Sequence, residues 1–178
     1  MNRKICLITF IAFTTGMVSA QSNVMKRGFH DLVLGISSSE LEEIVGFQGT
    51  VLSPNDYFAQ DRSGRKKENT PEYKSGFDQS INYKFIMPIP VTRVLLKNDR
   101  VVMIEVSSYP DFTRPICLDS KTGEGLKFWD SRESMEKIYG KQYRNDLSRD
   151  GTIQYFYYDS KGIGFALANN EVRIIYFY

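Results

Sequence analysis

Residues 32–46 read Leu32-Val-Leu-Gly-Ile-Ser-Ser-Ser-Glu-Leu-Glu-Glu-Ile-Val-Gly46, and residues 126–140 read Leu126-Lys-Phe-Trp-Asp-Ser-Arg-Glu-Ser-Met-Glu-Lys-Ile-Tyr-Gly140. The two stretches align without a gap at an offset of 126 − 32 = 94 residues. A second pair of stretches, residues 96–106 and 167–177, aligns at an offset of 167 − 96 = 71 residues. A helix pattern followed by a hairpin pattern, present twice in the same order, indicates one supersecondary unit used twice.

The first pair of stretches predicts two short helices, because apolar residues recur in them at helical spacing. These residues are Leu41, Ile44 and Val45 in the first copy, and Met135, Ile138 and Tyr139 in the second. A helix of two turns is unstable alone, so we expect each apolar stripe to be buried against a sheet.

Both ends of each predicted helix carry a boundary signal. The spacing of a capping box, which satisfies the free amides of the first turn, occurs in Ser37 with Glu40 and in Asp130 with Glu133. Gly46 and Gly140 stand where a left-handed residue would end each helix.

The second pair of stretches predicts two β-hairpins. Apolar residues alternate on both sides of Asn98-Asp99 and Asn169-Asn170, and Asn and Asp tolerate the positive φ angles of two-residue turns. Such turns bring pairs of residues onto one face, which we expect to lie against the helices. The pairs are Leu167 with Val172, Phe165 with Ile174, Ile163 with Tyr176, Leu96 with Val101, and Val94 with Met103. Residues 153–158 and 81–87 are predicted as the preceding strands.

These patterns predict an α+β fold of two tandem repeats, each a short helix packed on an antiparallel β-sheet. The first repeat spans residues 21–106, residues 107–125 form a linker, and the second repeat spans residues 126–178. The two offsets differ by 94 − 71 = 23 residues, which places an insertion inside the first repeat. Residues 58–80, polar and rich in both charges, account for it. We expect a solvated, protruding loop, and a role in contacts stays open.

The N-terminus has the pattern of a secretory signal peptide. Arg3 and Lys4 precede a short apolar segment, and Val18-Ser-Ala20 offers small residues for cleavage, so residues 1–20 are predicted to be removed. The apolar segment is too short to span a bilayer. We therefore expect a periplasmic or extracellular protein. Without the peptide, which contains Arg3 and Lys4, the chain has 23 − 2 = 21 basic and 21 acidic residues. The net charge therefore gives no reason to expect nucleic acid as a partner.

The sequence supplies little for catalysis or metal binding. Cys6 leaves with the signal peptide, so Cys117 has no intramolecular partner and the fold is not a disulfide scaffold. The single histidine is His30, and a nucleophile pair of Cys117 with His30 would form only in the folded chain. No residues have the spacing of a zinc or calcium site, and the glycine pairs at 123–125 and 162–164 lack the lysine of a phosphate-binding loop. We expect no enzyme activity, no metal and no cofactor.

The element Gly35-Ile-Ser-Ser-Ser-Glu40-Leu41-x-x-Ile44-Val45-Gly46 resembles the helix signature of the SmpA/OmlA type of outer-membrane assembly lipoprotein. It is also similar to the tandem modules of the β-lactamase inhibitory proteins. The resemblance implies short helices against one face of an antiparallel sheet, and a role in gripping a protein partner. The chain lacks both the acylatable cysteine of the lipoproteins and the cysteine pair that each inhibitor module carries.

An aromatic face is predicted on the side of the second sheet that lies away from the helix. If Tyr158 pairs with Ile163, the strands place aromatic, arginine and apolar side chains around a floor of glycine and alanine. The members of this face are Tyr155, Tyr157, Arg173, Ile175 and Phe177. Rigid rings and arginine provide contact area in protein interfaces. A second interpretation stays open, in which the rings shield the glycine strand or pack on the first repeat through Val91, Leu95, Val102, Ile104 and Val106.

The residues thus predict an exported, non-catalytic binding protein that recognises a protein or envelope component through this aromatic face. Inhibition of a partner enzyme is one form of this function. The alternative is a structural or assembly factor of the bacterial cell envelope, and the third hypothesis is a hydrolase. The sequence does not identify the partner.

Overall fold

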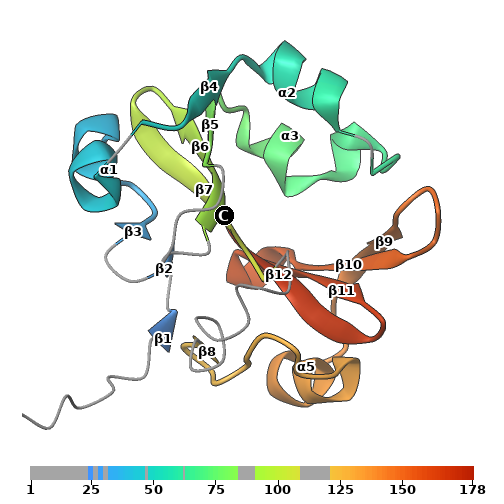
Figure 1. Cartoon of the computed structure of the whole chain (residues 1–178). Helices are drawn as coiled ribbons and strands as arrows, with labels where there is room; N and C mark the ends of the chain where they lie inside the picture. The colour runs from blue at the N-terminus through green and yellow to red at the C-terminus, as the bar shows by residue number, and fades with distance from the viewer. Residues whose placement is uncertain are drawn as a thin grey trace, which may run out of the picture.

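The computed structural model describes residues 24–25, 28–29, 32–46, 48–61, 63–83, 91–108 and 121–178. The predicted signal peptide, His30, Cys117, most of the predicted linker and the second half of the predicted strand 81–87 lie outside these residues. The described chain has an α+β fold with a few short helices and one eight-stranded antiparallel sheet, which confirms the predicted class (Figure 1).

The sheet has the strand order β4-β5-β6-β7-β12-β11-β10-β9, so β7 and β12 join its two halves. Its strands are β4 (Thr50–Leu52), β5 (Gln79–Asn82), β6 (Val91–Lys97), β7 (Arg100–Ser107), β9 (Arg144–Leu147), β10 (Ile153–Tyr158), β11 (Ile163–Ala168) and β12 (Glu171–Phe177). Two small pairs lie apart from it: β1 (Val24–Met25) with β8 (Lys121–Thr122), and β2 (Gly28–Phe29) with β3 (Leu32–Val33).

Two helices, α1 (Ser38–Val45) and α5 (Arg132–Tyr139), cover one face of the sheet, which we call the helix face. Leu41 and Met135 are fully buried there. The prediction was wrong for Ile138, which is 36% exposed, and Ile44 is only half-buried. In α5 the buried residues are Met135 and Tyr139. They lie four positions apart and therefore on the same side of the helix, which is the side that packs on the sheet.

The helix boundaries follow the predicted signals with one shift. Ser37 and Glu40 form the capping box of α1, and Gly46 ends that helix with a left-handed φ of 77°. The N-cap of α5 is Ser131 rather than Asp130. The carboxylate of Asp130 instead accepts a hydrogen bond from the backbone N–H of Lys127 at 2.8 Å.

Both predicted hairpins are present, and each contains a β-bulge that changes its register. The turn residues Asn98-Asp99 and Asn169-Asn170 have positive φ, as expected. Beyond each bulge the predicted partners were wrong, because an extra residue moves every following side chain to the other face. The observed pairs are Phe165 with Ile175, Ile163 with Phe177, and Val94 with Ile104.

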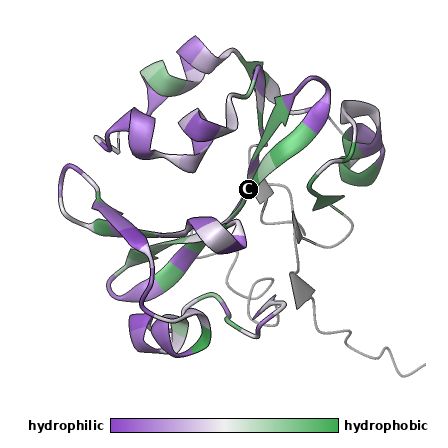
Figure 2. Ribbon diagram, turned by 180° about the vertical axis from the view of Figure 1, so that it is seen from behind, coloured by the Kyte–Doolittle hydropathy of each residue, from purple (hydrophilic) through white to green (hydrophobic). Residues whose placement is uncertain are grey.

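The predicted loop 58–80 contains helices, although many of its residues are exposed. It includes the end of α2 (Pro54–Gln60), then η1 (Lys67–Asn69), α3 (Pro71–Ser75) and the start of β5, and Tyr57, Phe58 and Phe77 pack on the second face of the sheet. We call residues 53–76 the strap. In Figure 1 the two halves of the sheet diverge, with α2 and α3 on the inner side and with α1 and α5 on the outer side. The ribbon of the strap is mainly hydrophilic (Figure 2), which explains why its sequence resembles a surface loop.

Candidate functional site

The second face of the sheet carries a row of tyrosines on β10 and β12. Tyr155 pairs with Ala166 and Tyr157 with Gly164, as predicted, and the two rings stack with centroids 6.4 Å apart. A Cβ atom on Gly164 would lie 3.1 Å from the Tyr157 ring, so glycine lets this ring lie flat on its neighbour strand. The Arg144 guanidinium on β9 lies 4.3 Å from the centroid of the Tyr157 ring, and we call Arg144, Tyr155, Tyr157 and Tyr176 together the tyrosine face.

The five predicted binding residues do not form one exposed face. Tyr155 and Tyr157 lie on the tyrosine face but are only 4% and 1% exposed. Ile175 and Phe177 are buried in the other core, on the helix face, because the bulge in β12 shifts them there. Arg173 is the extra residue of that bulge, and its guanidinium contacts Glu171 at 3.2 Å.

The strap covers the tyrosine face through the side chain of Arg65. The Arg65 guanidinium carbon lies 4.3 Å from the centroid of the Tyr155 ring. Its three nitrogens donate to different acceptors: Nη1 to the Tyr157 hydroxyl at 2.6 Å, Nη2 to Glu72 Oε1 at 3.1 Å, and Nε to Ser63 Oγ at 3.0 Å. We call Ser63, Glu72, Tyr155 and Tyr157 the guanidinium cage.

The electrostatics of the cage keep Arg65 charged. Its side chain is 6% exposed, and this burial alone would lower the pKa of the guanidinium, but the Glu72 carboxylate and the surrounding tyrosines raise it above its ordinary value. Burial also raises the pKa of the Tyr157 hydroxyl, so that side chain stays neutral. Among the described residues, the second carboxylate oxygen of Glu72 is buried without a hydrogen-bond partner.

A second arginine site lies beside the cage on β6. The Arg93 guanidinium donates to Glu105 at 3.2 Å, to the Tyr57 hydroxyl at 3.1 Å and to Asn82 Oδ1 at 3.0 Å. A hollow of about 260 Å³ opens here, between α2 and strands β4 to β6. Its lining residues are Leu52, Tyr57, Gln60, Asp61, Asn82 and Arg93.

A larger hollow of about 350 Å³ lies at the rim of the tyrosine face, where the strap meets the β9–β10 turn. Its lining residues are Ser63, Ser148, Arg149, Asp150, Ile153 and Tyr155. The strap is tied to the turn there by a hydrogen bond of 2.7 Å from the backbone N–H of Arg149 to the carbonyl of Ser63. We call this hollow the rim site.

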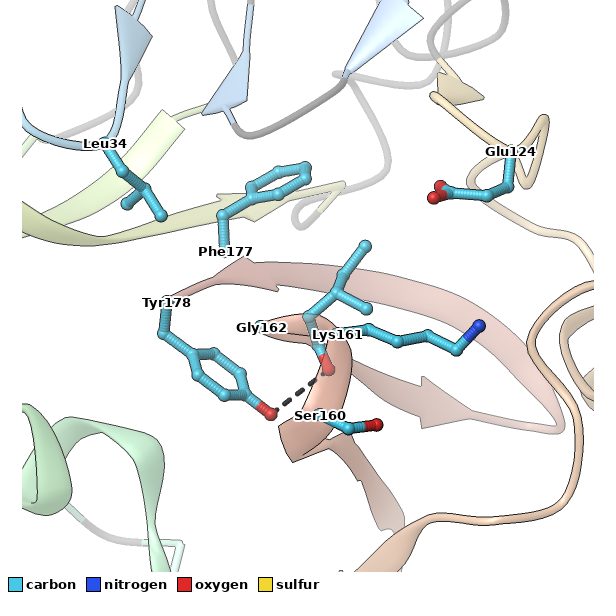
Figure 3. Close-up of a pocket in the computed structure, with 8 residues that line it drawn as sticks. Leu34, Glu124, Ser160, Lys161, Gly162, Phe177 and Tyr178 are labelled. Atoms are coloured by element: carbon cyan, nitrogen blue, oxygen red, sulfur yellow. Dashed lines mark hydrogen bonds between the residues drawn. The ribbon is translucent and has the colours of Figure 1, made fainter.

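A third cavity, of about 220 Å³, lies at the end of β12 near the join of the two halves (Figure 3). Phe177 and Leu34 form an apolar side, and Glu124 and Lys161 stand at the other side. The Glu124 carboxylate already accepts a hydrogen bond of 2.6 Å from the hydroxyl of Tyr139. This cavity is small, and its lining mixes apolar with charged residues.

Within the described ranges, no group of three or more His, Cys, Asp or Glu side chains is arranged to hold a metal ion. No helix of the described chain combines the length and the apolar composition needed to cross a membrane. Comparison of the chain with protein-family models, with curated proteins and with solved structures gave no significant match.

Sequence reasoning missed the residues of the strap that complete the site, namely Arg65, Glu72 and Tyr57. A signal for their ordered placement was present, since Ser53-Pro54 and Thr70-Pro71 are N-cap residues followed by a proline suited to the first helical position. These pairs indicate two helix starts inside the predicted loop. The contact between Arg65 and β10, by contrast, has no signature in the sequence.

Proposed function

We propose that the chain is an exported, non-catalytic binding protein that recognises a protein or envelope component, and that the rim site is its docking surface. The observation that carries this proposal is the hollow beside Tyr155, which is lined by Ile153 and by the charged, exposed Arg149 and Asp150. An apolar contact inside a polar, charged border is the arrangement of a protein interface. Inhibition of a partner enzyme is one form that such binding takes.

We also propose that the fold consists of two tandem copies of one unit. The sheet order supports this, since β4-β5-β6-β7 from the first copy meets β12-β11-β10-β9 from the second in reverse order. The N-caps Ser37 and Ser131 lie 131 − 37 = 94 residues apart. The extra residues of the two hairpin bulges, Val102 and Arg173, lie 173 − 102 = 71 residues apart. These are the two offsets of the sequence alignment.

The loop before each helix is also tied to its hairpin in the same way. The backbone N–H of Gly35 donates to the carbonyl of Val101 at 2.8 Å, and that of Trp129 donates to the carbonyl of Val172 at 2.9 Å. These pairs again differ by 129 − 35 = 94 and 172 − 101 = 71 residues. The duplicated unit fits the resemblance to the SmpA/OmlA lipoproteins and the β-lactamase inhibitory proteins, which remains part of the proposal.

The docking surface is tested by affinity capture from the native source, with residues 21–178 as bait. The variant Arg149→Glu reverses a charge at the rim site, and this side chain is exposed, so stability should be nearly unchanged. We expect at least a tenfold loss of captured partner. The matched control is Val51→Lys on β4, the opposite edge strand, where Val51 is 59% exposed.

Equal capture by the parent and by the rim variant would contradict the proposed docking surface. Loss of capture by Val51→Lys alone would indicate that the interface lies at the other edge of the sheet. A captured partner that is an integral membrane protein would favour the assembly-factor hypothesis over an inhibitor.

A further inference from the structure

The guanidinium cage is built for an arginine side chain. It offers an aromatic ring against the flat side of the guanidinium, together with three acceptors around its edge, one of which is a carboxylate. A lysine cannot satisfy this arrangement, because its ammonium is compact and lacks the planar fork of donors. Cation–π contact and charge-assisted hydrogen bonds both strengthen when water is excluded, as it is here.

Arg65 fills this cage incompletely. Guanidinium and carboxylate groups often pair through two parallel hydrogen bonds, but Arg65 bonds only one oxygen of Glu72. The other oxygen is buried and has no partner among the described residues. Open hollows of about 350 Å³ and 260 Å³ flank the strap where it crosses the sheet. An external arginine that approached Glu72 through both oxygens would use acceptor capacity that Arg65 leaves unused.

The larger hollow leads directly to the cage. Ser63 and Tyr155, which contact the Arg65 guanidinium, also line the hollow at the rim. Residues 63–66 lie outside α2, η1 and α3, so Arg65 can shift while the helices of the strap keep their places. If Arg65 leaves, the carboxylates of Glu72 and Asp61, 3.1 Å and 3.8 Å from its guanidinium, lose the positive charge that it supplies. The vacated cage then favours a cation.

We propose that the cage is an arginine-recognition site, that Arg65 is its internal occupant, and that an arginine side chain of a protein partner displaces it through the rim site. This inference rests on the proposed binding function and adds the chemistry of the partner. Arg65 thereby holds the tyrosine face closed until an arginine-bearing segment of the partner enters.

The site is tested on the full mature chain with Arg65→Ala, which vacates the cage, and with methylguanidinium chloride as the probe. Methylammonium chloride at equal concentration is the matched control, because it has the same charge without the planar fork. We expect methylguanidinium to raise the unfolding midpoint of Arg65→Ala by several degrees in a saturable manner, with no rise from methylammonium and none for the parent. Adding Glu72→Gln to the variant should abolish the rise.

Equal responses to the two salts, or equal responses of variant and parent, would overturn the proposal. If Arg65→Ala does not fold, the same titration is made on Arg65→Lys, which keeps a positive charge opposite Glu72 but cannot fill the cage. There too, no gain from methylguanidinium overturns the inference.

The two proposals fail separately. If methylguanidinium raises the unfolding midpoint in a saturable manner but the rim variant captures as much partner as the parent, the docking surface is refuted and the cage is retained. Capture that depends on Arg149, together with no guanidinium effect, would refute only the cage.

Discussion

The buried ion pair between Arg65 and Glu72 gives the sharpest stability prediction. The two side chains are 6% and 2% exposed, so removal of Arg65 leaves the Glu72 charge buried without compensation, and removal of Glu72 leaves Arg65 only the more distant Asp61, at 3.8 Å. Such a loss typically costs about 3–5 kcal/mol. We therefore expect Arg65→Met and Glu72→Leu each to lower the free energy of unfolding by roughly this amount. The double variant leaves neither charge and fills the space with apolar groups, so it should cost less than either single change.

The assay is urea unfolding of the parent, both single variants and the double variant, with the slope of the transition checked for constancy. Lys74→Met is the matched control, because it removes an ion pair to Asp159 from the same strap where both side chains are about half exposed, at 49% and 47%. An exposed pair of this kind contributes about 0–1 kcal/mol. The reasoning is refuted if the double variant costs the sum of the single variants, or if Arg65→Met costs no more than Lys74→Met.

Three further outcomes follow from the structure. Met135→Ala should cost about 2–5 kcal/mol in urea unfolding because it leaves a cavity in the core, whereas Ile138→Ala on the same helix should change stability by less than about 1 kcal/mol. Gly164→Ala should cost about 1–3 kcal/mol, since its methyl group would meet the Tyr157 ring at 3.1 Å; an unchanged midpoint would show that the ring can move away freely. The Glu136 carboxyl has a pKa below its ordinary value of 4.5, because it accepts hydrogen bonds from a tyrosine and an arginine. Its contribution to the free energy of unfolding is therefore present above pH 4.5 and lost as the pH falls below that value. Glu136→Gln should make the stability depend less on pH in that acid range.

Much of the local structure could be predicted from the sequence, because local signals determine it. The capping box of Ser37 and the left-handed Gly46 set the limits of α1, and paired Asn and Asp residues set the two-residue hairpin turns. The pairing of Tyr155 with Ala166 also followed from strand alternation alone. The α+β class and the antiparallel hairpins follow from the same patterns, whereas the joining of β7 to β12 into one sheet was not predicted.

The tertiary structure decided which face each strand residue occupies. One extra residue in β12, Arg173, moves Ile175 and Phe177 to the helix face, and the alternating pattern contains nothing that marks this bulge. Both faces of β12 are apolar, so either register satisfies the hydrophobic pattern equally well.

The tertiary structure also decided that side chains of the strap are buried against the sheet, and this burial forms the candidate site. Charges in a sequence predict solvation, since burial of an unpaired charge is costly. Arg65 and Glu72 are nonetheless buried, because each supplies the charge that the other requires and the tyrosines of β10 complete the contacts. Whether two opposite charges seven positions apart meet in the interior depends on the path of the chain between them and on the surface that they meet, and the sequence pattern specifies neither.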